Sequence, residues 1–327
     1  MTTTAIIAYS IVIPVYNAEA TLATLLARIQ AVMDPLSVPY EVIFVEDRGG
    51  DNSWELIRDL YEQYPQIVCG VRLSRNFGQH AATLCGLHIA TGEWVITLDD
   101  DLQLPPEAIP QLIDRQRDTQ ADCVYGIYTE SHQPFIRKMG SRLMQYVMRQ
   151  TFACSVDVSS FRLLRRELVQ KMLRHRQGLL FLDGLIGWHT QDVAAANVTR
   201  QKRQYGQSGY NLWSLAALLL HLIFNYTLFP LRIAFGLGCL SLGLGIAFYL
   251  RWLPIPLGKG LSITQAFVGS VWIVGGLLGI SIAIAVAYLL RIYVTVQQKP
   301  LFSVRETLPP SEWAKKNSEI AGSMAIY

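Results

Sequence analysis

Three consecutive carboxylates, Asp99, Asp100 and Asp101, follow an apolar run that begins at Trp94. Like charges this close disfavour one another's ionisation, so the run is expected to bind something cationic. In extended backbone Asp99 and Asp101 share one face, Asp100 points away, and Gln103 returns to the first face. Carboxylates combined with phosphate oxygens and water are typical ligands of Mg²⁺ or Mn²⁺. The spacing therefore predicts a site where a divalent metal holds a phosphorylated ligand.

The alternative interpretation is a solvated acidic turn ahead of the helix that Pro105 and Pro106 introduce. Polar clusters at the ends of other predicted strands argue against it. Strands are predicted near residues 10–13, 41–45, 67–73, 94–98 and 122–125, with helices between them. This alternation predicts an α/β domain with a mostly parallel sheet, which binds ligands beyond the carboxyl ends of its strands. Clusters at residues 14–17, 46–47 and 74–78 follow the first three strands.

Composition excludes several other classes of site. The net charge is only +3, which gives no argument for nucleic acid. The five cysteines are scattered without a CxxC pair, so neither a zinc site nor a disulfide framework is indicated. Neither GxGxxG nor GxxxxGK[ST] occurs, so the chain lacks the glycine-rich loop with which dinucleotide-binding and P-loop folds bind phosphate.

The C-terminal third is predicted to lie in a membrane. Residues 229–250 carry one charge and residues 266–290 carry none, and each stretch exceeds the ~20 residues that cross the hydrocarbon core. Two buried core helices are the alternative, which these lengths disfavour. Lysine and arginine are concentrated before the first span and after the second. The two spans predict a multi-pass protein of the inner (plasma) membrane, with a catalytic domain at residues 1–210 and a tail at residues 293–327. The positive-inside rule places both of these parts in the cytoplasm.

Two further features of this region are predicted. Residues 211–228 form an interfacial helix along the membrane surface, or else a third short buried helix. Small residues recur at intervals of four at Gly275 and Gly279, and again at Ser241 and Gly245, which predicts a homo-oligomer through close helix approach. The alternative is that these residues only pack the two spans of one chain together.

Five stretches of the first 170 residues together resemble glycosyltransferases of family 2, which have the GT-A fold. They are Ser10–Asn17, Val45–Ser53, Ser74–Gln79, Leu98–Glu107 and Ser160–Leu164. With two spans after them, the chain is similar to polyisoprenyl-phosphate glycosyltransferases, above all the bactoprenol glucosyltransferases, with dolichol-phosphate mannose synthases as more distant relatives. The resemblance implies an inverting enzyme that moves one glucose from UDP-glucose onto undecaprenyl phosphate at the cytoplasmic face. The QxxRW motif of processive synthases is absent, which favours transfer of a single sugar.

The resemblance also implies roles for individual residues. Asp47 would accept a hydrogen bond from the nucleoside base, and Asp99 would face the ribose and diphosphate. Asp101 and Gln103, with Asp99, would hold Mg²⁺ or Mn²⁺. The substrate-binding set would further include Pro14, Tyr16, Glu19, Arg75, Asp100 and Arg203. The family's usual Asp-Asp-Gly-Ser reads Glu-Asp-Arg-Gly at residues 46–49, which keeps Asp47 but leaves no role for Gly49.

The acceptor side is predicted from fewer residues. Arg137 lies in a basic amphipathic stretch that suits a lipid headgroup, or that is only a solvated helix face. The resemblance implies that Asp157 is the candidate base, and Asp183 either competes for that role or only organises its loop. Arg162 either binds phosphate or forms a structural ion pair. The alternatives to glucose are mannose from GDP-mannose and a UDP-linked aminosugar, and the alternative to an enzyme is a non-catalytic membrane scaffold or translocation subunit.

Overall fold

The computed structural model describes residues 7–128, 158–174, 182–198, 229–252, 263–296 and 300–308. The chain forms two compact units, one of residues 1–208 with 299–327 and one of residues 209–298. Several predictions lie outside the described residues. They are the roles of Arg137, Asp157 and Arg203 and the interfacial helix at residues 211–228.

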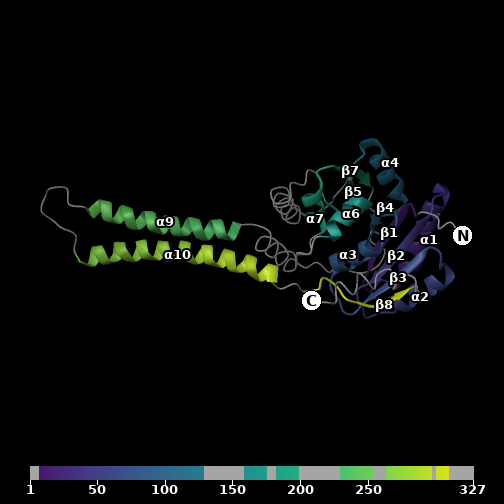
Figure 1. Cartoon of the computed structure of the whole chain (residues 1–327), viewed down its shortest axis with the longest axis horizontal. Coiled ribbons are helices and arrows are strands. Elements are labelled where there is room, and N and C mark those ends of the chain that lie inside the picture. The colour runs from purple at the N-terminus through teal and green to yellow at the C-terminus, as the bar shows by residue number, and fades with distance from the viewer. Residues whose placement is uncertain are drawn as a thin grey trace. The chain divides into compact units, whose positions relative to one another are not determined.

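The first unit is built on an eight-stranded sheet with the strand order β7-β5-β6-β4-β1-β2-β3-β8 (Figure 1). The strands are β1 Tyr9–Val15, β2 Tyr40–Glu46, β3 Val68–Leu73, β4 Trp94–Thr97, β5 Cys123–Tyr128, β6 Arg162–Arg165, β7 Val193–Val198 and β8 Val304–Leu308. Strand β1 pairs in parallel with β2 and β4, as do β2 with β3 and β5 with β7. Strand β6 runs antiparallel to β4 and β5, and β8 runs antiparallel to β3. The mostly parallel sheet predicted from the alternating pattern is confirmed.

Helices cover both faces of this sheet, as expected for strands with two apolar faces. One core contains side chains of α1, α2 and α4, and the other contains side chains of α3, α6 and α7. The helices are α1 Leu22–Met33, α2 Ser53–Gln63, α3 Gln79–Ile89, α4 Ile109–Thr119, α6 Arg166–Leu173 and α7 Leu182–His189, with short 3₁₀ turns at η1 Asp34–Leu36 and η2 Pro106–Ala108. Strand alternation divides β1 between the cores: Ile11 and Ile13 join the first and Val12 the second. Gly86 lets α3 approach the sheet, because a Cβ there would collide with Val12.

Strand β8 returns the chain to the first unit after the long apolar helices. It pairs with β3 at the sheet edge, with Gly70 opposite Leu308 and Arg72 opposite Glu306. The Glu306 carboxylate accepts from the indole N–H of Trp54 at 3.2 Å and from Arg58 at 3.2 Å. The sequence analysis treated these residues as a tail and did not predict the strand.

The second unit contains two helices that pack side by side, α9 Phe229–Trp252 and α10 Ile263–Val296 (Figure 1). The Ser241 hydroxyl donates to the Trp272 carbonyl at 2.9 Å, and the backbone of Gly276 fits against that of Gly238. Among the described helices, one segment, Phe267–Leu290, has the length and apolar composition to cross a membrane. The apolar part of α9, Arg232–Ala247, is shorter, so the first of the two predicted spans is not confirmed.

Candidate active site

The loops that follow β1, β2 and β4 are hydrogen-bonded to one another at the carboxyl ends of these strands. The Tyr16 backbone N–H donates to the Asp100 carboxylate at 2.9 Å, which joins the first loop to the acidic run. The Gly50 N–H donates to the Asn17 side-chain oxygen at 2.7 Å, which joins the first loop to the second. Three of the polar clusters expected at strand ends therefore form one site.

The acidic run turns sharply instead of continuing as a strand. Strand β4 ends at Thr97, and Leu102 has a φ of 58°, in the left-handed region that bulky residues rarely adopt. The Leu102 side chain is buried in the first core, which offsets the cost of that conformation. The extended backbone predicted from Asp99 to Gln103 is therefore wrong. Gln103 instead lies beside Asp101 because its backbone N–H donates to that carboxylate at 3.0 Å.

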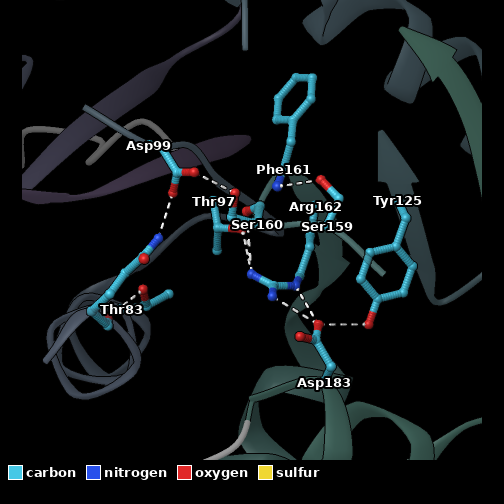
Figure 2. Close-up of polar contacts among 10 residues, drawn as sticks. Thr83, Thr97, Asp99, Tyr125, Ser159, Ser160, Phe161, Arg162 and Asp183 are labelled. Atoms are coloured by element: carbon cyan, nitrogen blue, oxygen red, sulfur yellow. Dashed lines mark hydrogen bonds and ion pairs between the residues drawn. The ribbon is translucent and has the colours of Figure 1, made fainter. Parts of the chain in front are cut away.

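Asp99 is oriented by a donor on each of its oxygens (Figure 2). The Gln79 side-chain amide donates to Oδ1 at 2.6 Å, and the Ser160 hydroxyl donates to Oδ2. Gln79 is the first residue of α3, and Ser160 precedes β6. These two residues belong to motifs that carry the family resemblance, but the sequence analysis gave neither of them a role.

Asp47 contacts the same loop from the other side. Its carboxylate accepts from the backbone N–H groups of Phe77 and Gly78, each at 2.7 Å, and so fixes the residues that immediately precede α3. Gly78 has a φ of 91°, which only glycine adopts without strain. Residues 77–79 thus connect the buried carboxylate of Asp47 with that of Asp99.

Burial and like charges shift the titration of these carboxyl groups. The pKa of Asp100 is raised to about 7, first by burial and then by the neighbouring charges of Asp99 and Asp101, against the lowering effect of the Tyr16 N–H. Burial also raises the pKa of Asp47, opposed by the N–H groups of Phe77 and Gly78. The acidic run therefore resists carrying three charges and favours a bound cation.

Glu46 supports the loop after β2 from beneath. The side chain is buried, accepts from the Gly49 N–H at 2.5 Å and pairs with Arg72 at 3.0 Å. Burial raises the pKa of Glu46, and the Gly49 N–H and the Arg72 charge oppose that rise. Arg72 in turn lies over the ring of Trp54, 5.7 Å from its centroid.

Arg162 and Asp183 form a buried ion pair beneath the segment that carries Ser160 (Figure 2). Arg162 Nη2 lies 2.7 Å and Nε 2.8 Å from Asp183 Oδ1, and the Tyr125 hydroxyl donates to the same oxygen at 3.0 Å. Burial lowers the pKa of Arg162, but Asp183, Tyr125 and Cys123 together outweigh it, so the net pKa of Arg162 is raised. This geometry favours the structural interpretation of both residues over phosphate binding by Arg162 and proton transfer by Asp183.

The remaining residues that were predicted to bind the nucleotide-sugar donor lie in or beside the same loops. The Glu19 carboxylate accepts from the Asn52 backbone at 3.2 Å, and Pro14 is buried in β1. Tyr16 is exposed, and so is Arg75, whose guanidinium stacks on the Phe77 ring at 4.6 Å. The shared nucleoside pocket of Pro14, Tyr16, Glu19 and Asp47 stays a prediction.

The described residues fit a metal that is held largely by its substrate. They contain no group of three histidine, cysteine or acidic side chains arranged as a metal site. Mg²⁺ commonly uses only one or two carboxylates and takes its other ligands from phosphates and water. Asp101, which accepts from the Gln103 backbone N–H, and Asp99, which accepts from Gln79, are the carboxylates of the acidic run that could supply such ligands.

Comparison with known proteins identifies the family. The model of Glycosyl transferase family 2 matches residues 10–173, which include the loops described above. The chain belongs to glycosyltransferase family 2. Its mostly parallel α/β sheet agrees with the GT-A fold expected from the motifs.

Relatives of this glycosyltransferase match over nearly the whole chain. An Aeromonas hydrophila protein named undecaprenyl-phosphate 4-deoxy-4-formamido-L-arabinose transferase is 34% identical, with 91% of this chain and 93% of that protein covered. A Synechocystis protein described as an uncharacterized glycosyltransferase is 32% identical, covering 91% and 94%. Among solved structures, glucosyl-3-phosphoglycerate synthase from Mycobacterium tuberculosis, in complex with Mn²⁺, UDP and phosphoglyceric acid, matches with a TM-score of 0.49 and 18% identity, over 66% of this chain and 76% of that one.

Proposed function

We propose that this glycosyltransferase moves one sugar from a nucleotide donor onto a polyisoprenyl phosphate, with inversion at the anomeric carbon. The observation that carries the proposal is the convergence of Asp47, Asp99 and Asp100 at the carboxyl ends of adjacent parallel strands. Relatives named as undecaprenyl-phosphate transferases, which match over both units, support the lipid acceptor.

The donor would lie across the three joined loops. Asp47 would accept a hydrogen bond from the nucleoside base, and Pro14, Tyr16 and Glu19 would line the same pocket. Asp99 would face the ribose and diphosphate. A divalent metal held by Asp101 and neighbouring oxygens, when bound, stabilises the charge that develops on the leaving diphosphate. Oriented carboxylates suit this task because they need no reorganisation during the reaction.

The acceptor would approach from the membrane surface. A phosphate monoester has a second pKa near ~6, so much of a lipid phosphate is already dianionic at neutral pH. The attacking oxygen then needs little help from a base, and Asp157 would mainly orient the acceptor. Arg137 and Arg203 would neutralise phosphate charge on the acceptor and the donor. These three roles come from the sequence.

Three sugars are candidates for transfer. The names of the formamido-arabinose transferases favour the aminosugar alternative, whereas the motif pattern led to UDP-glucose. GDP-mannose is a third candidate, because mannose synthases have similar motifs.

We further propose that the enzyme is a homo-oligomer of the inner membrane with its catalytic domain in the cytoplasm. The apolar segment Phe267–Leu290 supports membrane insertion. Ser241 and Gly245 are occupied in packing α9 against α10, which fits the alternative interpretation of that pair. A Cβ atom added at Gly275 or Gly279 would meet no described atom within 4 Å, so we propose this second pair as the contact with another copy.

The experiment is a donor panel with undecaprenyl phosphate, Mn²⁺ or Mg²⁺ and the full chain in lipid or detergent. UDP-glucose, UDP-linked 4-deoxy-4-formamido-L-arabinose and GDP-mannose are compared by mass spectrometry of the lipid product. We expect one glycosyl group per lipid, with a UDP donor the fastest. Faster turnover with GDP-mannose would overturn the UDP proposal. No product from any donor, with nucleotide binding retained, would favour the scaffold alternative.

A further inference from the structure

Ser160 links the oriented carboxylate of the donor site to the buried core of the sheet. Its hydroxyl donates to Asp99 Oδ2, and its backbone carbonyl accepts from the Thr97 hydroxyl at 2.5 Å and from Arg162 Nη1 at 3.2 Å (Figure 2). The Ser160 hydroxyl is therefore fixed at the site, and its backbone carbonyl is fixed by residues of the core. No role in donor binding follows from this residue's place in the sequence alone.

We infer that Ser160 is a positioning residue for Asp99, and that the buried pair of Arg162 and Asp183 holds Ser160 in place. This inference rests on the proposed function, because the geometry that it explains is that of the nucleotide donor. Ser160 acts through Asp99 and takes no part in bond making or breaking.

The Ser160 hydroxyl constrains Asp99 together with the Gln79 side-chain amide, each from a different oxygen of the carboxylate. A carboxylate has about four acceptor positions, and the donors from Gln79 and Ser160 occupy one on each oxygen. The plane of the carboxylate is then set from two elements, the start of α3 and the segment before β6.

The buried pair explains why Ser160 can act as a fixed donor. Arg162 reaches Asp183 through Nε and Nη2, and a planar guanidinium held at two nitrogens has the direction of its third nitrogen fixed. That third nitrogen, Nη1, holds the Ser160 carbonyl. Burying an ion pair gives little net stability compared with apolar packing, so a specific orientation is the better explanation for placing one here.

The chain supplies a matched control in the adjacent residue. The Ser159 hydroxyl accepts from the Phe161 N–H at 3.0 Å, a local turn contact, while the Ser160 hydroxyl points to Asp99 (Figure 2). Replacing either serine with alanine removes one hydroxyl from the same loop. Only the second replacement removes a donor from the site carboxylate.

The test compares Ser160→Ala, Ser160→Thr and Ser159→Ala in the full chain, with steady-state kinetics against donor and acceptor separately. A hydrogen bond to a charged group contributes ~1.5–3 kcal/mol, which corresponds to a loss of roughly 10- to 150-fold in kcat/KM for the donor with Ser160→Ala. The KM for the lipid acceptor should not change. Ser160→Thr keeps the hydroxyl and should recover most of the loss, and Ser159→Ala should match the unmodified enzyme.

Two further measurements separate positioning from folding and from the proposed function. At a temperature well below the melting temperature of every variant, titration of each enzyme with UDP in the presence of Mn²⁺ should show weaker binding to Ser160→Ala than to Ser159→Ala. Asp183→Asn, which weakens the support of Arg162, should raise the donor KM more than the acceptor KM. If the unmodified enzyme transfers sugar but Ser160→Ala behaves like Ser159→Ala, this inference is wrong. Absence of transfer by the unmodified chain would instead overturn the proposed function.

Discussion

Replacing Arg72 with methionine should destabilise the first unit in a way that depends on pH. Arg72 neutralises Glu46, which is buried beneath the loop that carries Asp47. Breaking a buried ion pair by removing one partner costs about 3–5 kcal/mol. The Arg72 side chain is 19% exposed, so solvent screens part of its charge and we expect roughly 2–3 kcal/mol. For a domain of about 150–250 residues this lowers the melting temperature by roughly 4–12 °C.

The sign of the pH effect follows from the pKa of Glu46. Burial already raises it above the ordinary value of 4.5, and loss of the Arg72 charge raises it further. Between the unfolded and the folded pKa the native state holds more protons than the unfolded state, so stability falls as pH rises. The deficit of Arg72→Met relative to the parent should therefore be largest above the folded pKa. It should shrink as the pH falls toward 4.5, where the carboxyl group protonates in both states.

The assay is thermal unfolding of the full chain in detergent, followed by tryptophan fluorescence at pH 5 and pH 8. Arg58→Met is the matched control, because its ion pair with Glu306 is exposed on both sides and is expected to contribute only ~0–1 kcal/mol. Adding Glu46→Gln to Arg72→Met should restore part of the stability, since the amide oxygen still accepts from Gly49. Equal deficits at both pH values, or no recovery in the double variant, would refute this reasoning.

Two other predictions concern the metal and the helices. Asp101→Asn should abolish transfer, whereas Asp157→Asn should leave measurable activity with a weak pH dependence above neutrality. Initial rates at saturating Mg²⁺ or Mn²⁺ decide this, and equally inactive variants with intact substrate binding would establish a true base. Gly276→Leu should disrupt the packing of α9 on α10, because the new side chain would collide with the Gly238 backbone. Gly275→Leu should leave that packing intact and instead weaken the association between copies of the chain. Cross-linking in detergent compares the two, and an unchanged oligomer in Gly275→Leu would exclude that surface.

The sequence predicted the parts of the fold that depend on local pattern. Alternating apolar strands and amphipathic helices identified β1 to β5, and the strand-end rule placed the loops at Tyr16, Asp47 and Asp99 in one site. The acidic turn was mispredicted because a left-handed Leu102 is stabilised by burial in the core, which sequence spacing does not reveal. Strands β6 to β8 are short or lie far along the chain from their partners, so their pairing depends on tertiary contacts.

The contacts of Gln79 and Ser160 with Asp99 were missed for a similar reason. These residues are 20 and 61 positions from Asp99, and no periodicity relates them. Both lie in motifs quoted for the family resemblance, and that membership was the only signal of a role. The ion pair of Arg162 and Asp183 joins β6 to α7 across 21 residues, and the sequence left its role open between catalysis and structure.

The pairing of strand β8 determines whether the chain before it crosses a membrane an even or an odd number of times. It follows α10 in sequence, yet it completes the sheet formed by residues that precede α9. One folded unit cannot lie on both sides of a bilayer, so the chain between β7 and β8 crosses an even number of times or not at all. If Phe267–Leu290 spans the membrane, a second crossing is required, and α9 is the one other described helix between these strands.

This constraint predicts the sidedness of two engineered cysteines in a background where exposed Cys239 is replaced by serine. Lys259→Cys lies between α9 and α10, and Ser303→Cys lies just before β8. With two crossings and a cytoplasmic catalytic unit, an impermeant maleimide added outside the intact inner (plasma) membrane should label Lys259→Cys. Ser303→Cys should react only after the inner membrane is opened. The opposite result would be that Lys259→Cys is labelled only after the inner membrane is opened, although α10 resists extraction from the membrane. In that case α10 would lack a second crossing helix, and the two-span arrangement would be contradicted.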